Sequence, residues 1–258
     1  MTAAVQDTFA MLLRHQRNFL RQPIWITFAL TQPMFWLLLY SQLFRRITDL
    51  PGFNTSSYVQ FLTPGIVVMT SFFGATWSGM SMIDDLDRGV IQRFLATPTR
   101  RISLIVSQVL HTAIVSSVQT VIILGTAWLL GARVEKGLVG WLLIIAVAAL
   151  VAAAFGGISH GIALLVRREE PLIAILNFFG LPLTFISAIL IAETLMPDWM
   201  RWAAKFNPVN WAVIAARELS NHGTDWSRVG IYLGLLVAFV ALTSALATRA
   251  FESYRRTL

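Results

Sequence analysis

The sequence contains no cysteine, which excludes disulfide frameworks, thiolate metal sites and cysteine nucleophiles. It is also poor in charge, because only 13% of its 258 residues are Asp, Glu, Lys or Arg. Soluble domains carry roughly 25% charged residues. Hydrophobic residues make up 56% of the chain, and its mean hydropathy is +0.68. The composition therefore predicts an integral membrane protein and argues against a soluble enzyme, a disordered tail or a coiled coil.

Lysine is almost absent, because the chain has only two lysines, Lys136 and Lys205, but eighteen arginines. Neither lysine lies in a Gly-x-x-x-x-Gly-Lys-Ser/Thr loop, so the chain has no phosphate-binding loop of that type. Its histidines show no ligand spacing, and we expect His15 and His222 to form no cluster with the others. The sequence predicts no metal site and no catalytic residue.

Six apolar stretches are long enough to cross a bilayer as helices, which requires about 20 residues each. Their length excludes barrel strands, so the predicted fold class is an all-α integral membrane protein. The expected spans are residues 24–44, 59–83, 102–130, 138–166, 172–192 and 229–248.

Arginine and lysine between the spans set the expected orientation. With the N-terminus inside, twelve of these cations lie on the cytoplasmic side and eight on the other. We therefore expect both termini in the cytoplasm. Arginine-rich, lysine-poor usage suggests a GC-rich bacterial genome, hence a multi-pass protein of the bacterial inner membrane.

The N-terminal residues 1–23 combine apolar side chains at helical spacing with Arg14, Arg17 and Arg21. This pattern is typical of an amphipathic helix at the cytoplasmic membrane interface, which Pro23 ends. The alternative is an ordinary basic flank that only fixes the orientation of the first span.

The segment 84–101 between the second and third spans predicts a short amphipathic helix. Leu86, Val90, Ile91, Phe94 and Leu95 share one face, while aspartates gather at its N-terminal end, where a helix dipole favours them. Acidic residues bind a negative leaflet poorly. The helix is therefore expected to contact a cytoplasmic protein partner, with a solvated connector as the alternative.

The same segment resembles a known signature. Asp85-Leu86-Asp87-Arg88-Gly89, followed by Ile91, Leu95, Thr97-Pro98 and Arg100, is similar to the Glu-x-Glu-Arg-Gly-Thr-Leu-Glu motif of type-2 ABC exporter permeases. Aspartates replace both glutamates here, Val90 replaces the threonine, and Gln92 replaces the last glutamate.

Two further segments carry the resemblance. Residues 58–66, Tyr-Val-Gln-Phe-Leu-Thr-Pro-Gly-Ile, are similar to the drug-resistance subgroup, the daunorubicin-exporter-like permeases. Asn207-Pro208-Val209-Asn210-Trp211 and Ala215-Ala216-Arg217 resemble the pattern that precedes the last span of this family.

The resemblance implies the membrane half of an ATP-driven exporter of an amphiphilic drug, lipid or glycan. The chain would bind no cofactor, because ATP and Mg²⁺ would bind two copies of a separate ATPase subunit. It would pair with a second permease chain as a homodimer or heterodimer, within lipid and without nucleic acid. The resemblance assigns coupling to the ATPase to Asp84, Asp85, Leu86, Asp87, Arg88, Gly89, Ile91, Phe94 and Leu95. Exchanging Asp85 and Asp87 for lysine is expected to uncouple transport.

Residues 193–228 are too polar for a full span and too apolar for a plain loop. Tryptophans alternate there with charged residues, and Pro197 and Asn207-Pro208 divide the segment. The resemblance implies short helices that re-enter the outer half of the membrane. The alternative is a surface loop anchored by tryptophans.

Polar residues form a stripe on the third span, where they line either a transport pathway or contacts between helices. The candidates for the pathway are Gln108, His111, Ser116 and Gln119. An ion-gradient-driven secondary transporter is the alternative function, but the six spans hold no central Asp or Glu, which such coupling usually needs.

The pair Ser159-His160 raises the possibility of an intramembrane hydrolase. Adjacent helical side chains point about 100° apart, so these two are badly placed to act as nucleophile and base. We expect Gly156, Gly157, Ser159 and Gly161 to form a close helix contact instead, and Ser159→Ala to transport almost normally.

Overall fold

The computed structural model describes residues 2–44, 57–90, 101–221 and 223–255, and these are almost entirely helical, with no strand among them. The chain is thus all-α, as the composition predicts. The elements are α1 Thr2–Leu20, α2 Pro23–Leu43, α3 Tyr58–Trp77, α4 Gly79–Asp87, α6 Arg101–Leu129, α7 Gly137–Val166, α8 Glu169–Phe185, η2 Glu193–Leu195, α9 Asp198–Ala204, α10 Pro208–Ser220 and α11 Trp226–Arg255.

Four helical segments are long and apolar enough to cross a membrane: Tyr58–Asp87, Ser103–Leu129, Gly137–Val166 and Trp226–Phe251. They correspond to the second, third, fourth and sixth predicted spans. The first predicted span coincides with the 21-residue helix α2. The fifth overlaps α8, which has only 17 residues. Six crossings therefore remain a prediction.

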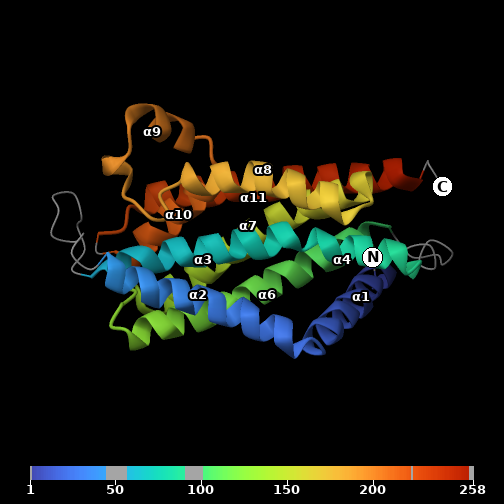
Figure 1. Ribbon diagram of the computed structural model, residues 1–258, viewed down its shortest axis with the longest axis horizontal. Coiled ribbons are helices and arrows are strands. Elements are labelled where there is room, and N and C mark those ends of the chain that lie inside the picture. Colours follow the sequence, from blue (N-terminus) through green and yellow to red (C-terminus); the bar gives the residue numbers. More distant parts are fainter. Residues whose placement is uncertain (1, 45–56, 91–100, 222, 256–258) are drawn as a thin grey trace.

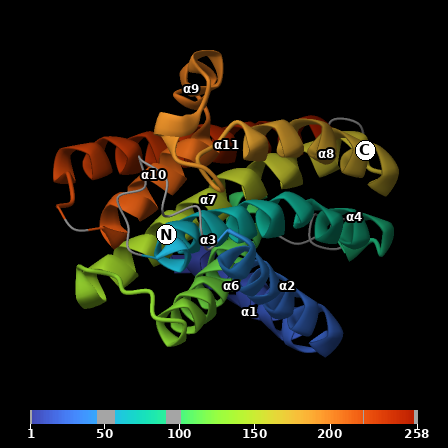
Figure 2. The same cartoon turned by 60° about the vertical axis from the view of Figure 1, so that its left-hand side comes forward.

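Helix α7 is the centre of the bundle. In both views it runs between a layer formed by α8 and α11 and a layer formed by α3 and α6 (Figures 1 and 2). It packs against α11, α6, α3, α10 and α4. Its middle section is wholly buried at Ile144, Val147, Ala148 and Val151, which explains why apolar and small residues are needed at these positions.

The buried side chains form two clusters at opposite ends of the bundle. One contains Met11 of α1, Leu86 of α4, Leu172 of α8 and Phe251 of α11. The other contains residues of α3, α7, α10 and the loop after α8. The start of α1, the end of α4 and the end of α11 therefore share one end of the molecule, on the right in Figure 1, while α9 and α10 lie toward the other.

Two predicted boundaries were wrong. The fifth stretch was expected to stay helical to residue 192, but α8 ends at Phe185, three residues after Pro182. The helix expected within residues 84–101 is interrupted, because α4 ends at Asp87 and Gly89 has a φ of 65°. Glycine adopts this left-handed conformation readily and commonly ends helices in this way.

Candidate coupling surface and outer polar network

The predicted coupling residues at the end of α4 lie on two faces of the helix, one buried in the bundle and one exposed. Leu86 is buried with Met82 and Ile83, which fixes that face against the bundle. Asp84, Asp87 and Arg88 are exposed, and Gly89 forms the turn that follows. The candidates Ile91, Phe94 and Leu95 lie outside the described residues.

Asp85 differs from its acidic neighbours because it is paired within the chain. Its Oδ1 lies 2.7 Å from Nη2 of Arg14 in α1, and the two side chains are only 15% and 31% exposed. Charged hydrogen bonds of this length are strong when partly shielded from water. Asp85 therefore anchors the N-terminal helix to α4, a contact between residues 71 positions apart that periodicity did not reveal.

An open, polar cleft lies beside the exposed aspartate at the end of α4. It is lined by Ile83 and Asp87, and by the turn between α7 and α8, which supplies Arg167, Arg168, Glu169 and Glu170. This cleft presents charges of both signs at the end of the bundle where α4 terminates. Such a surface suits a protein partner better than acyl chains.

Helix α1 covers the part of the polar stripe on α6 that contains His111. The ring of His111 lies 5.8 Å from that of His15 and 5.8 Å from that of Phe19, centroid to centroid. His15 therefore lies beside another histidine, because α1 folds back onto α6. Among the described residues, no group of three His, Asp or Glu side chains could hold a metal ion.

Burial and, to a smaller extent, the positive charge of Arg14 together lower the pKa of His15 from 6.5 to about 4. His111 of α6 faces this ring, His160 of α7 lies within electrostatic range, and Asp85 of α4 is paired with Arg14. Docked α1 thus holds His15 neutral, whereas an undocked α1 exposes a histidine of ordinary pKa.

Docking of α1 is expected to weaken as the pH falls from about 6.5 toward 4. In that window the undocked helix binds a proton that the docked helix does not. This difference weakens the free energy of docking by up to about 3 kcal/mol. An environment-sensitive dye at Asn18→Cys, an exposed position in a cysteine-free chain, would report it. The same label with His15→Phe should show a smaller transition, because His111 and the Arg14–Asp85 pair remain. An equal transition in both proteins would contradict the prediction.

The remaining candidates for the pathway make contacts between helices. Ser116 donates to Oγ of Ser71 at 2.7 Å and lies 3.3 Å from the carbonyl oxygen of Ala148. Gln119 reaches the carbonyl oxygen of Ala29 at 3.4 Å. Gln108 Nε2 lies 3.8 Å from the sulfur of Met82. Each side chain is buried inside the chain, and a role in lining a pathway remains a prediction.

Ser159 and His160 do not bond each other. The hydroxyl of Ser159 donates to the carbonyl oxygen of Thr76 and accepts from the backbone N–H of Gly79. The ring of His160 contacts the carbonyl oxygen of Gly156 in its own helix. The expected close helix contact is confirmed, since Gly157 and Gly161 pack against α11.

At the opposite end of the molecule, α10 supports the loop that follows α8. The side-chain amide of Asn207 donates to the carbonyl oxygens of Leu183 and Ile186 at 2.7 and 2.8 Å. Oδ1 of Asn210 accepts from the N–H of Ala188 at 2.8 Å. These bonds satisfy backbone groups that the end of α8 leaves open within an apolar environment.

Arg217, two turns further along α10, also binds the loop after α8. Its Nη2 donates to the carbonyl oxygen of Ala188 at 2.6 Å, and its guanidinium lies 3.8 Å from the ring centroid of Phe61 in α3. A cation over an aromatic face is stabilised, more so when shielded from water. The loop after α8 is thus held by a partly buried cation shared with α3.

Helix α3 contacts the same loop directly. The hydroxyl of Tyr58 donates to the carbonyl oxygen of Leu190 at 3.2 Å. At Gly65 the backbones approach so closely that a methyl group would overlap the carbonyl group of Ile189. The two segments 58–66 and 207–217, far apart in the sequence, therefore converge on residues 186–193.

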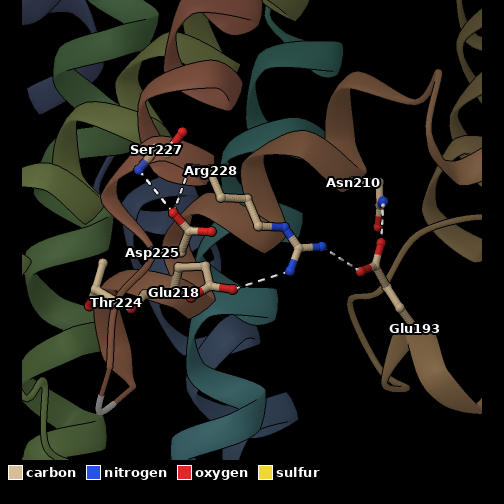
Figure 3. Close-up of polar contacts among 7 residues, drawn as sticks. All are labelled: Glu193, Asn210, Glu218, Thr224, Asp225, Ser227 and Arg228. Carbon is tan, nitrogen blue, oxygen red and sulfur yellow. Dashed lines mark hydrogen bonds and ion pairs between the residues drawn. The ribbon is translucent and has the colours of Figure 1, made fainter.

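A cluster of charged residues extends this network to the last helix. Arg228 at the start of α11 pairs with Glu193 at 3.1 Å and with Glu218 of α10 at 3.3 Å, as Figure 3 shows. Nδ2 of Asn210 donates to the other oxygen of Glu193 at 3.2 Å. The cluster thus ties η2, α10 and α11 together. We define the outer polar network as Asn207, Asn210, Arg217, Glu193, Glu218 and Arg228.

Comparison with known proteins places these features in a family. The sequence model described as ABC-2 type transporter matches residues 6–220. This chain belongs to the ABC-2 type transporter family. Residues 58–66 and 207–217, which carry two parts of the resemblance, both fall within the match, as does the end of α4.

The relatives of this ABC-2 permease include proteins named for drug resistance. It is 27% identical to the daunorubicin resistance ABC transporter permease protein DrrB1 of Streptomyces coeruleorubidus over 257 residues, 97% of this chain and 87% of the relative. It is 28% identical to the putative transport permease ycf38 of Cyanophora paradoxa, covering 85% and 76%. It is 26% identical to the probable doxorubicin resistance permease DrrC of Mycobacterium tuberculosis strain H37Rv, covering 76% and 69%.

An ABC-2 permease is the transport component of an ABC system and is not itself the ATPase. The sequence identified the segments that this permease shares with the family, but not the residues that these segments contact within the chain. Arg14 was interpreted as a lipid-facing cation, whereas it pairs with Asp85. Glu193 and Arg228 had no assigned role in the sequence, and only the folded chain brings them together as an ion pair beside Asn210 and Glu218.

Proposed function

We propose that this chain is the membrane-spanning subunit of an ATP-driven exporter that moves an amphiphilic drug, lipid or glycan out of the cytoplasm. Two copies of a separate subunit bind ATP and Mg²⁺, and two permease chains form the pathway. The complex resides in the bacterial inner membrane, with both termini of the permease in the cytoplasm.

The observation that carries the proposal is the exposed end of α4 beside the polar cleft. Asp84, Asp87 and Arg88 project from a helix whose other face is locked into the bundle by Leu86. A force applied to these side chains is therefore transmitted to packed helices instead of to a loose loop. The turn between α7 and α8 extends this surface with four charged residues.

The cargo class is supported by the relatives. Two of the proteins compared are named for resistance to daunorubicin and doxorubicin. The assignment of the cytoplasmic side is supported by the positions of three helix ends. Helix α1 starts, and α4 and α11 end, at the same end of the bundle. In the predicted orientation this end is cytoplasmic.

The double exchange Asp84→Lys and Asp87→Lys is expected to reduce copurification of the ATPase with the tagged permease at least tenfold and to abolish export. Both side chains are exposed, so the exchange should leave the fold intact. Because Asp85 is engaged by Arg14, the structure favours testing its neighbours instead. Copurification, drug export from cells and melting temperature in detergent would be measured.

The matched control is Glu135→Lys with Asp198→Lys, which makes the same charge change toward the opposite end of the molecule. ATPase binding and export should survive this control. Normal copurification and export with lysines at 84 and 87 would overturn the coupling assignment. Export by proteoliposomes that contain only the permease and an ion gradient would overturn the ATP-driven mechanism.

A further inference from the structure

The second membrane-crossing segment is broken in its cytoplasm-proximal half. Helix α3 ends at Trp77, and α4 begins at Gly79 after a single residue. In an unbroken helix, the N–H of Gly79 would donate to the carbonyl oxygen of Ala75. That oxygen instead accepts from the N–H and the hydroxyl of Ser78, at 3.1 and 2.6 Å. The break therefore frees backbone groups that need other partners in a buried site.

Ser159 of α7 supplies those partners. Its hydroxyl accepts from the N–H of Gly79 at 3.0 Å and donates to the carbonyl oxygen of Thr76. One side chain thus bridges the last turn of α3 and the first residue of α4. Ser159 is wholly buried, so no water reaches this site to replace the hydroxyl.

Gly79 makes the contact sterically possible. A methyl group at this position would overlap both the side chain and the carbonyl group of Ser159. The backbones of α4 and α7 therefore meet without intervening side chains. This contact and the hydroxyl bridge give α4 a fixed pivot on α7, while its far end carries the exposed Asp84, Asp87 and Arg88.

We propose that Ser159 is a positioning residue that makes the α3–α4 break a defined pivot, through which displacement of the end of α4 reaches the central helix α7. Because the helix ladder is interrupted at Ser78, the displacement is not passed straight along α3. The transport consequence rests on the proposed function, whereas the pivot itself is a property of the fold. This proposal replaces the expectation, drawn from the sequence, that Ser159→Ala transports almost normally.

Ser71 offers a matched control for Ser159→Ala. Its hydroxyl is also buried, donates to the carbonyl oxygen of Val67 at 2.8 Å and accepts from the hydroxyl of Ser116 at 2.7 Å, but it lies at no helix break. Removing either hydroxyl leaves buried backbone or side-chain groups short of a partner. A purely structural role therefore predicts similar losses in Ser159→Ala and Ser71→Ala.

The first measurement uses the purified permease alone. Spin labels at Asp84→Cys and Glu170→Cys, both exposed, report the distance from the end of α4 to the start of α8 in a chain without native cysteines. Ser159→Ala should broaden this distance distribution at least twofold, while Ser71→Ala leaves it unchanged. An unchanged width in Ser159→Ala, or equal broadening in both, would overturn the pivot.

The second measurement uses the complex with its ATPase. Ser159→Ala should lower the amount of drug exported per ATP hydrolysed about tenfold while ATP hydrolysis stays within twofold of the parent. Ser71→Ala should keep the parental ratio. An unchanged ratio in Ser159→Ala would overturn the transmission role. If the parent complex shows no ATP-dependent export, the proposed function fails, and the spin-label result still decides the pivot.

Discussion

Replacing Arg217 with methionine should abolish export and lower the free energy of unfolding by about 2–4 kcal/mol. The exchange removes the charged donor to the carbonyl oxygen of Ala188 and the cation over the ring of Phe61. A buried carbonyl group that loses its donor costs about 1–3 kcal/mol, and the lost cation–π contact adds to this. Melting temperature in detergent and drug export from cells would be measured.

Arg201 provides the control for this exchange. It also donates to backbone carbonyl groups of the same loop region, those of Glu193 and Met196, but its side chain is 44% exposed. Water can replace an exposed donor, so Arg201→Met should cost less than about 1 kcal/mol and leave most export. Equal behaviour of the two variants would show that burial of Arg217 in the outer polar network has no special role.

The exchange Gly65→Val is expected to prevent correct assembly of the permease. Even a methyl group at this position would overlap the carbonyl group of Ile189, and valine adds two more carbon atoms. Overpacking of this kind typically costs about 1–3 kcal/mol, and more where backbone cannot move. The loop after α8 is held by Tyr58, Asn210 and Arg217, which limits its ability to retreat.

Gly125→Val is the matched control, because this glycine also lies in a long apolar helix, α6, but no atom within 4 Å would meet a side chain there. We expect the control to accumulate and export normally. The yield of monodisperse protein from membranes and export from cells would be compared. Normal yield and export of Gly65→Val would refute the close approach of α3 to residue 189.

Helix positions were predictable because they depend on short-range properties of the chain. The ranges 102–130 and 138–166 agree with α6 and α7 within a residue at each end, since long apolar runs bounded by Gly or Arg leave few alternatives. The end of α8 was not predictable in this way. Residues 186–192 remain apolar after the helix ends, so the hydropathy of the sequence predicted a span that continued to residue 192.

That error has a specific physical cause. Backbone groups in an apolar environment normally require a helix, unless side chains bind them. Asn207 and Asn210 bind the backbone around residues 183–188, and they follow in the sequence only about 20 positions later. Periodicity describes the face of one helix and carries no information about which other segment will supply such donors.

The amino-acid sequence by itself determined that this is a helical membrane protein without an ATPase motif, because composition, run length and breakers act locally. It also supplied the resemblance to ABC-2 permeases through Asp85–Gly89, residues 58–66 and Asn207–Arg217. Only the tertiary structure decided that Asp85 pairs with Arg14, that Arg217 holds the loop after α8, and that Ser159 bridges α3 and α4. These contacts join residues 29 to 83 positions apart, so they exist only once the helices have packed.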